Sequence, residues 1–368
     1  MDPLRVAMTV EQLWQPVPGG SGTYVAELSA ALARDASVDV VGLAARHPAP
    51  PGTPLLVPTR HVGLPRPVLY ESWNRWRRPR AEGTVPGPHV VHATTWAVPG
   101  TRRPLVVTVH DLAFLREPAH FTERGNRFFR RALEIVRAEA ARVVVPSEAT
   151  LRDCVDEGID RGRLVVVPHG VRARPVTEGD RADWRRRHGV ARPYVLWCGT
   201  LEPRKNVRRL VAAYAAAREA GLEHDLVLVG PSGWGGEAEA VEEALRSVPH
   251  GAVHLLGRLD DDDLHRAYSA AAAFAFPSLW EGFGMPVLEA MAHGTPVLTS
   301  VGSPMAELVG EDGVLVDPTS TDALADGLLR VVAPAAPDRV RARAARFTWE
   351  ASAQAHVRAY REASSASA

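Results

Sequence analysis

Residues 273–290 read AFAFPSLWEGFGMPVLEA, and this stretch decides the fold. The apolar run Ala273–Phe276 predicts a buried strand, a turn with two glycines follows, and Pro286 suits the first turn of a helix. Glycine lets the backbone approach a ligand closely, and the free N–H groups of a helix start form an anion site. A strand that passes through such a turn into a helix is the repeating unit of a parallel α/β sheet.

The same alternation runs through the chain in two blocks. In the first block we predict strands at 4–9, 38–43, 89–93, 105–109, 142–145 and 164–167, with helices such as 127–141 and 148–157 between them. In the second we predict strands at 194–198, 226–230, 253–257, 273–276, 296–299 and 314–316, and helices at 207–220, 237–246, 261–271, 286–292, 304–308 and 323–332. The pattern predicts an α/β protein with two doubly wound sheets whose strand carboxyl ends face a cleft.

This pattern divides the 368 residues into four parts. Residues 1–172 form the first domain, and the polar stretch 173–190 is the linker. Residues 191–347 form the second domain, and we expect the helix within 348–368, which no strand follows, to cross back to the first domain.

Composition argues against several classes of protein. Basic and acidic residues number 43 each, so a nucleic-acid partner is not expected. Cys154 and Cys198 are far apart, which argues for buried thiols in a reducing cytoplasm and against a zinc site or disulfide framework. The first residues are too few and too polar for a signal peptide, and no apolar run approaches the ~18 residues of a membrane span.

Lys205 is the only lysine in the chain, because the other 42 basic residues are arginines. It lies in the stretch 197–206, WCGTLEPRKN, between a predicted strand and a predicted helix. A lone lysine indicates a place where a planar guanidinium does not serve, such as a phosphate oxygen in a narrow cleft. The alternative is a chance survivor on a solvated surface. Cations oppose the dipole at a helix start, so Arg204 and Lys205 there favour a nearby anion.

Glu281 and Glu289 bracket the turn formed by Gly282, Phe283 and Gly284. One glutamate lies before the helix and the other within it. Carboxylates beside a phosphate site are poor phosphate ligands but good acceptors for sugar hydroxyls. The pattern therefore predicts a nucleotide sugar, with its phosphates at the turn, hexose hydroxyls at one glutamate and ribose hydroxyls at the other.

The segment 281–289, together with 199–206 upstream, resembles the family 4 retaining glycosyltransferases of the GT-B fold, and the likeness covers nearly the whole chain. The resemblance implies two Rossmann-like domains, the first binding the acceptor and the second the nucleotide sugar. In that family the first glutamate contacts the transferred sugar, the second contacts the ribose, and the upstream lysine binds the diphosphate. These roles fall on Glu281, Glu289 and Lys205.

The upstream stretch departs from the family in one place. Many members carry an arginine directly after the glycine that is Gly199 here, and this chain has Thr200. Arg204 is then the nearest second cation for the phosphates. We also expect Gly257, Arg258 and Leu259 to form a wall of the base pocket, whereas the run 260–263 is interpreted as a helix cap and solvated face, not a metal site.

Two features of the first domain are candidate site residues. A histidine at a strand end is more often structural, but in the resembled family a histidine at the position of His110 lies beside the transferred sugar, so we include it as catalytic. We interpret His92 and His169 as hinge or packing residues. Gly19, Gly20 and Gly22 form either a plain loop before a helix or a mobile loop that closes over the donor phosphates or the acceptor, and the resemblance favours the second.

The resemblance implies a retaining hexosyltransferase that needs no metal and no cofactor, because lysine and helix amides stabilise the leaving diphosphate. Its acceptor would be a glycan, a lipid-linked molecule or a small molecule, and the GTLEPRKN variant resembles members that use GDP-mannose. Two alternatives stay open: a sugar-nucleotide epimerase of the same fold and a non-catalytic partner subunit. The second would be expected to lose Lys205 or one of the two glutamates, and this chain keeps all three.

The segment 60–80 carries six arginines and one glutamate, which accounts for the excess of 22 arginines over 17 acidic residues in 1–172. It also holds Trp73 and Trp76. The segment either docks on a membrane that carries a lipid-linked acceptor, or grips an anionic acceptor, or packs its tryptophans into the core. Prolines limit any helix in it to about 68–78. We expect a cytoplasmic protein, either free or peripheral at the inner face of the membrane.

Overall fold

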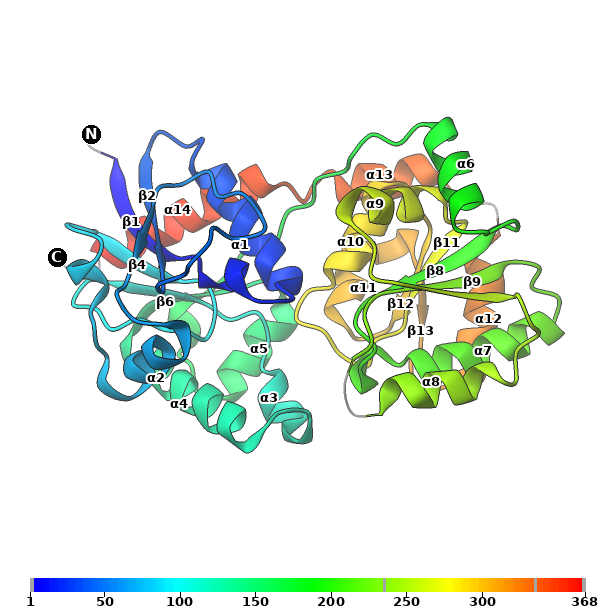
Figure 1. Cartoon of the computed structure of the whole chain (residues 1–368), viewed down its shortest axis with the longest axis horizontal. Helices are drawn as coiled ribbons and strands as arrows, with labels where there is room; N and C mark the ends of the chain where they lie inside the picture. The colour runs from blue at the N-terminus through cyan, green and yellow to red at the C-terminus, as the bar shows by residue number, and fades with distance from the viewer. Residues whose placement is uncertain (1–2, 234–235, 334–335, 366–368) are drawn as a thin grey trace. The chain divides into compact units, whose positions relative to one another are not determined.

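The computed structural model describes residues 3–233, 236–333 and 336–365. The chain divides into two compact units, of which one comprises Met1–Gly170 with Thr348–Ala368 and the other comprises Val171–Phe347. Each unit is built around one parallel sheet (Figure 1). The predicted α/β fold class with two parallel sheets is confirmed.

Within the described part of the first unit, the sheet has seven strands in the order β3-β2-β1-β4-β5-β6-β7. The strands are β1 (Leu4–Thr9), β2 (Val38–Ala44), β3 (Thr59–His61), β4 (Val90–Ala93), β5 (Leu105–Thr108), β6 (Ala140–Val145) and β7 (Leu164–Val166). Edge strand β3 was missed by the sequence analysis, because its three residues Thr-Arg-His carry no apolar signal.

Helices α1 (Gly19–Leu32), α2 (Arg66–Trp76), α3 (Ala113–Arg116), α4 (Glu123–Glu139), α5 (Glu148–Asp156) and α14 (Trp349–Ser365) belong to the first unit. Local sequence sets two of their starts, since the hydroxyls of Thr122 and Ser147 accept hydrogen bonds from the first turns of α4 and α5. In Figure 1 the red helix α14 lies beside the blue helix α1, which it contacts, and it also packs on β4, β5 and β6.

The second sheet, in the described residues, has the order β10-β9-β8-β11-β12-β13. Its strands are β8 (Tyr194–Cys198), β9 (Asp225–Val229), β10 (Val253–Gly257), β11 (Ala273–Phe276), β12 (Val297–Ser300) and β13 (Val314–Val316). All their neighbouring pairs are parallel. The strands at 194–198, 253–257, 273–276 and 314–316 have the predicted bounds, because each is an apolar run that ends at a glycine, a polar residue or a proline.

The helices of the second unit are α6 (Glu178–Arg187), α7 (Val207–Glu219), α8 (Glu237–Leu245), α9 (Asp261–Ala270), α10 (Met285–Ala292), α11 (Pro304–Val309), α12 (Thr321–Val331) and α13 (Pro337–Ala344). Helix α6 corrects the expectation that 173–190 is only a linker. Thr177 and Asp180 form a capping box at its start, and Trp184 is fully buried against Tyr194. The high charge of this segment concealed a helix whose only apolar anchor is one tryptophan.

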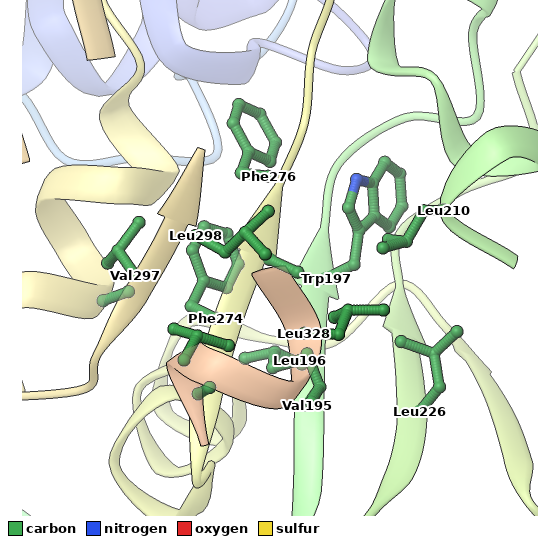
Figure 2. Close-up of a cluster of buried hydrophobic side chains, with 14 of the residues drawn as sticks. Val195, Leu196, Trp197, Leu210, Leu226, Phe274, Phe276, Val297, Leu298 and Leu328 are labelled. Carbon is green, nitrogen blue, oxygen red and sulfur yellow. The ribbon is translucent and has the colours of Figure 1, made fainter. Parts of the chain in front are cut away.

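The core of the second unit lies against both faces of its sheet. Figure 2 shows Trp197 of β8 beside Leu210 of α7, and Phe274 of β11 near Leu298 of β12. All four side chains are fully buried. Burying a side chain of this size contributes about 1.5–3 kcal/mol, so these contacts fix the strand ends on which the site depends.

A buried polar network attaches α14 to the sheet of the first unit. The hydroxyl of Tyr24 lies 2.7 Å from Oγ1 of Thr108 and 2.9 Å from Nε2 of His356 on α14. His92 lies 2.8 Å from the same Thr108 oxygen through Nε2, and its Nδ1 lies 2.8 Å from the hydroxyl of Tyr360. The interpretation of His92 as a packing residue is therefore consistent with its surroundings. Burial lowers the pKa of His356 to about 4 and the pKa of His92 well below 6.5.

These histidines predict acid lability of the first unit. The folded pKa values of these histidines lie below the unfolded value near 6.5. Their contribution to the free energy of unfolding is therefore fully present above pH 6.5 and is lost as the pH falls toward 4. At pH 5 His356 should account for a loss of about 2 kcal/mol in the free energy of unfolding, compared with neutral pH. In thermal unfolding at pH 7.5 and pH 5, His356→Gln should show a smaller acid loss than the parent chain. The exposed His250→Gln should change nothing, and an equal loss in both variants would contradict the assignment.

Candidate active site

The turn after β8 is held against a second turn by glycines. The N–H of Gly199 donates to the carbonyl of Val229 at 2.9 Å, and a Cβ on Gly230 would lie 1.7 Å from the Gly199 carbonyl oxygen. Gly233 approaches the carbonyl of Leu201 as closely. Any larger residue at Gly230 or Gly233 would push this turn out of place. The glycine pair therefore sets the path of the chain that leads to Lys205.

Asn206 holds the chain directly after Lys205 in place. Its backbone is left-handed, with φ of 61°, and its side-chain amide donates to the carbonyls of Pro277 at 3.0 Å and Pro318 at 2.7 Å. Pro277 follows β11, so this one side chain links the end of β8 to the end of β11. Asparagine tolerates the left-handed region better than most residues, which explains its use here.

Lys205, Arg204 and Glu281 form one ion cluster. Nζ of Lys205 lies 2.5 Å from Oε1 of Glu281, and a guanidinium nitrogen of Arg204 lies 2.7 Å from the same oxygen. Arg204 also pairs with Glu202 at 2.7 Å. Burial would raise the pKa of Glu281, but the two cations outweigh it and lower that pKa to about 2. Burial lowers the pKa of Lys205, and Glu281 opposes that change.

Lys205 is enclosed, which is consistent with the prediction that an arginine would not serve. Its side chain is 9% exposed, and its ammonium lies 4.7 Å from the ring centroid of Phe276 at the end of β11. Arg204, in contrast, lies over the Trp280 ring at 4.9 Å. The structure thus brings together the two basic residues and the first glutamate that the sequence analysis singled out.

Gly282, Phe283 and Gly284 are buried between Glu281 and the start of α10. Gly284 precedes the helix with φ of 101°, and a Cβ there would lie 2.4 Å from Cγ of Met305. Only glycine fits both the conformation and the space. In the first turn of α10, Pro286 carries no N–H and the N–H of Val287 donates to the carbonyl of Gly284 at 3.0 Å, so an anion site at this helix start stays a prediction.

Glu289 has surroundings opposite to those of Glu281. Its Oε2 accepts a hydrogen bond from the hydroxyl of Tyr268 on α9 at 2.9 Å. Burial raises the pKa of Glu289 to about 7, although the Tyr268 hydrogen bond opposes this. Burial likewise raises the pKa of the neighbouring Cys198 thiol to about 12. Tyr268 and Cys198 were not predicted as site residues, because a buried tyrosine on a helix gives no signal that separates it from an ordinary core residue.

The remaining predicted residues of the second unit lie at strand ends. Thr200 follows Gly199, and Arg204 is the second cation at Glu281. Gly257 ends edge strand β10, and Arg258 and Leu259 follow it. The carbonyl of Gly257 accepts from the N–H of Gly230 at 2.8 Å.

The run 260–263 splits into two roles. Asp260 caps α9 through the N–H of Asp263 at 2.8 Å, as expected. Asp263 is not part of a solvated face, because it pairs with Arg187 and Arg266.

In the first unit, His110 follows β5 and is partly exposed. Its Nε2 lies 2.9 Å from the carbonyl oxygen of Thr94, and Tyr24 packs edge-on against its ring at 4.8 Å. His169 is buried at 5.5 Å from the His110 ring and stacks on Trp349. Burial lowers the pKa of His110.

Gly19, Gly20 and Gly22 lie in a helix and not in the predicted loop, whereas their contact with the donor phosphates or the acceptor stays a prediction. These residues form the first turn of α1. The N–H of Gly22 donates to the carbonyl of Pro18 at 3.1 Å, and a Cβ on Gly22 would lie 2.3 Å from Cβ of Pro18. The proline packs on the glycine and fixes the helix start, which leaves the exposed Gly19 and Gly20 at a helix N-terminus.

A polar group at the ends of β1, β2 and β3 was missed. Buried Glu11 accepts the N–H of Ala45 at 2.7 Å and lies 2.8 Å from Nε2 of His47. Trp14 stacks on His47 at 4.6 Å, and His61 packs edge-on against the same indole. The available signal was a polar residue at the end of each of three neighbouring strands or within three positions of it.

Comparisons with known proteins agree with this geometry. Residues 192–333 match the family described as glycosyl transferases group 1, and residues 18–174 match glycosyltransferase family 4. The D-inositol 3-phosphate glycosyltransferase of Actinosynnema mirum is 32% identical over 94% of this chain and 92% of its own. O-antigen chain mannosyltransferase B of Escherichia coli is 28% identical over 80% of this chain and 81% of its own.

Solved structures share the fold. The Anabaena protein HepE in complex with UDP and glucose superposes with a TM-score of 0.72 at 20% identity, over 96% of this chain and 98% of its own. Sucrose-phosphate synthase from Thermosynechococcus elongatus superposes with a TM-score of 0.76 at 24% identity, over 98% of this chain and 99% of its own. The fold and the site define a nucleotide-sugar-dependent glycosyltransferase of the GT-B fold. The chain belongs to glycosyltransferase family 4, whose members retain the anomeric configuration.

Replacing Lys205 by arginine should leave the fold intact and reduce turnover roughly 100-fold, because a misplaced phosphate contact costs on the order of 3 kcal/mol in the transition state. The measurement is initial rates of transfer. The matched control is Arg208→Lys, an exposed neighbour on α7, which should keep the parent rate. A Lys205→Arg enzyme as fast as the control would show that the enclosed ammonium is not needed.

The two glutamates should separate in kinetics. Glu281→Gln should lower turnover yet bind nucleoside diphosphate more tightly, because a phosphate must compete with Glu281 for Lys205. Glu289→Gln should mainly raise the donor KM. Because the Glu289 pKa is about 7, the parent KM should fall between pH 6 and pH 8 as the carboxylate forms, and this dependence should vanish in Glu289→Gln. Indistinguishable variants would mean that the two residues do not hold opposite ends of the donor.

Proposed function

We propose that the protein transfers a hexose, with mannose as the preferred assignment, from a nucleoside diphosphate sugar to a glycan, lipid-linked or small-molecule acceptor. The observation that carries the proposal is the pairing of Lys205 and Arg204 with Glu281 directly before the start of α10. The buried Lys205 and the partly exposed Arg204 suit a diphosphate, and the carboxylate beside them suits a sugar hydroxyl. An E. coli relative named as a mannosyltransferase supports the choice of mannose and thus of GDP-mannose.

In this proposal Lys205, Arg204 and the α10 amides hold the diphosphate, Glu281 holds the transferred sugar, and Glu289 holds the ribose. The bond from the anomeric carbon to the diphosphate oxygen breaks, and the acceptor oxygen bonds to that carbon on the same face. The acceptor proton passes to the leaving phosphate oxygen. The cations stabilise the charge on that oxygen. They thereby take the role that a metal ion has in other transferases. We also propose that His110 contacts the transferred sugar, as a histidine at this position does in the resembled family.

The acceptor side of the proposal rests on the first unit. Trp14 and His47 suit a sugar or polyol, since the indole offers a flat apolar face, and the buried Glu11 holds His47 in place. The name of the A. mirum relative, a D-inositol 3-phosphate glycosyltransferase, supports a polyol or phosphate-bearing acceptor.

Segment 60–80 supports peripheral membrane contact in part. Trp73 is buried, as the packing alternative expected, whereas Trp76 is 65% and Val68 50% exposed on α2. Within the described residues, no helix is long and apolar enough to span a bilayer. We propose that the enzyme is cytoplasmic and that α2 meets a membrane surface through these exposed side chains.

A panel of nucleotides tests the function. GDP should raise the melting temperature more than UDP or ADP does. At a concentration a hundredfold above its Kd, GDP should stabilise the folded protein by about 2.7 kcal/mol relative to the ligand-free protein. With GDP-mannose and an acceptor, the product should keep the α-configuration by NMR, and EDTA should not reduce the rate. An epimerised sugar without acceptor would identify an epimerase, and donor binding without any turnover would favour a partner subunit.

A further inference from the structure

The first unit contains a hollow of about 1220 Å³ beside α2. Residues on both sides of that helix in the sequence line it, together with the loop before β5. Four of the lining residues are arginines and one is acidic, namely Arg78, Arg80, Arg102, Arg103 and Glu82. The hollow therefore carries a net charge of +3 from five residues.

The loop that carries two of these arginines is rigidly held. Oε1 of Glu82 accepts the backbone N–H of Arg102 at 2.7 Å, and Oγ1 of Thr101 accepts the N–H of Arg103 at 2.8 Å. The N–H of Ala81 donates to the carbonyl of Gly100 at 3.0 Å. These bonds fix the backbone and leave the guanidinium groups of Arg102 and Arg103 free to project from it.

The positive charges of the hollow are not neutralised within the described chain. No carboxylate of the described residues lies within 4.0 Å of the four guanidinium groups, although Glu82 lines the same hollow and its charge raises the pKa of Arg80. The neighbouring Arg77 differs, since it pairs with Glu139 at 2.6 Å and donates to the carbonyl of Val98. Partial burial, and then the charges of Arg102 and Arg78, lower the pKa of Arg80. Like charges gathered in this way lack the counter-charge that other arginines of this unit have.

These arginines lie at the opposite edge of the sheet from the candidate active-site residues. Arg80 precedes β4, and Arg102 and Arg103 precede β5, so they are at the amino ends of the strands. His110 follows β5 at its carboxyl end. Four strand residues at about 3.3 Å each separate the two edges. The hollow therefore does not hold the acceptor hydroxyl that reacts, which in such sheets lies at the carboxyl edge.

We propose that this hollow binds a phosphate-type anion with at least two negative charges, gripped by Arg78, Arg80, Arg102 and Arg103. The planar guanidinium fork matches phosphate oxygens two at a time, and several forks around one hollow suit a diphosphate or a bisphosphate. The shared chemistry is the phosphate group, carried either by a soluble molecule or by a lipid headgroup. The site does not depend on the proposed transfer reaction.

Calorimetric titration with inorganic pyrophosphate tests the site. The parent chain should show two binding events, of which one is lost in Lys205→Met and the other in the double variant Arg102→Ser, Arg103→Ser. The affinity of the hollow for pyrophosphate should fall at least tenfold in the double variant. In the parent chain this affinity should also fall as the salt concentration rises from 50 to 200 mM. The matched control replaces two exposed arginines of α4, Arg127→Ser and Arg130→Ser, and should keep both events.

Vesicles distinguish the source of the phosphate. If pyrophosphate gives only the event that depends on Lys205, the chain should sediment with vesicles that contain phosphatidylinositol 4-phosphate, whose phosphomonoester carries close to two negative charges, and the double variant should not. A double variant that keeps both pyrophosphate binding and vesicle binding at parent strength would overturn the proposal, as would a parent chain that shows neither. The Lys205 event reports separately on the donor site and on correct folding of the variants.

Discussion

The site depends on one constraint, which is that β8 and β11 are hydrogen-bonded parallel neighbours. Residues that follow two adjacent parallel strands must meet at the same edge of the sheet. Lys205 and Glu281 are 76 positions apart in sequence, and this pairing brings them to the same edge of the sheet, where Nζ of Lys205 lies 2.5 Å from Oε1 of Glu281. The chain leaves β8 toward β9 on one side and returns to β11 on the other, so the pair lies at the point where the strand order reverses. Such a reversal opens a crevice for a ligand.

The ion cluster is costly and therefore needs support. Moving charged groups out of water costs several kcal/mol each, and Coulomb attraction repays this only with good geometry. Here one carboxylate oxygen receives both cations, and Asn206 locks the two strand ends together. Removal of one partner would leave an uncompensated buried charge. A ligand with two phosphate groups offers the same cations another partner, so the cluster is suited to exchange as well as to stability.

Much of the fold could be predicted from sequence, because buried parallel strands are short apolar runs that end in glycine or polar residues. The stretch 273–290 is typical, since strand, turn and helix follow in the predicted order. The failures have local causes. Helix α6 presents one apolar anchor among charged residues, β3 has no apolar signal, and the glycines at 19–22 are helical because Pro18 packs on Gly22. Each of these depends on a contact that the local pattern does not contain.

For the candidate site, too, the local sequence pattern predicts the position of residues but not their surroundings. Sequence placed Glu281 and Glu289 around one turn, but nothing in the spacing of eight residues tells that their acidities differ. Glu281 faces two cations, and its pKa is lowered to about 2, whereas Glu289 faces the hydroxyl of Tyr268, and its pKa is raised to about 7. At neutral pH the first is a fixed anion that can balance the phosphate cations, and the second is poised between two protonation states. Environments that separate two carboxylates in this way give them separate tasks on one ligand, and only the three-dimensional neighbours decide which task each takes.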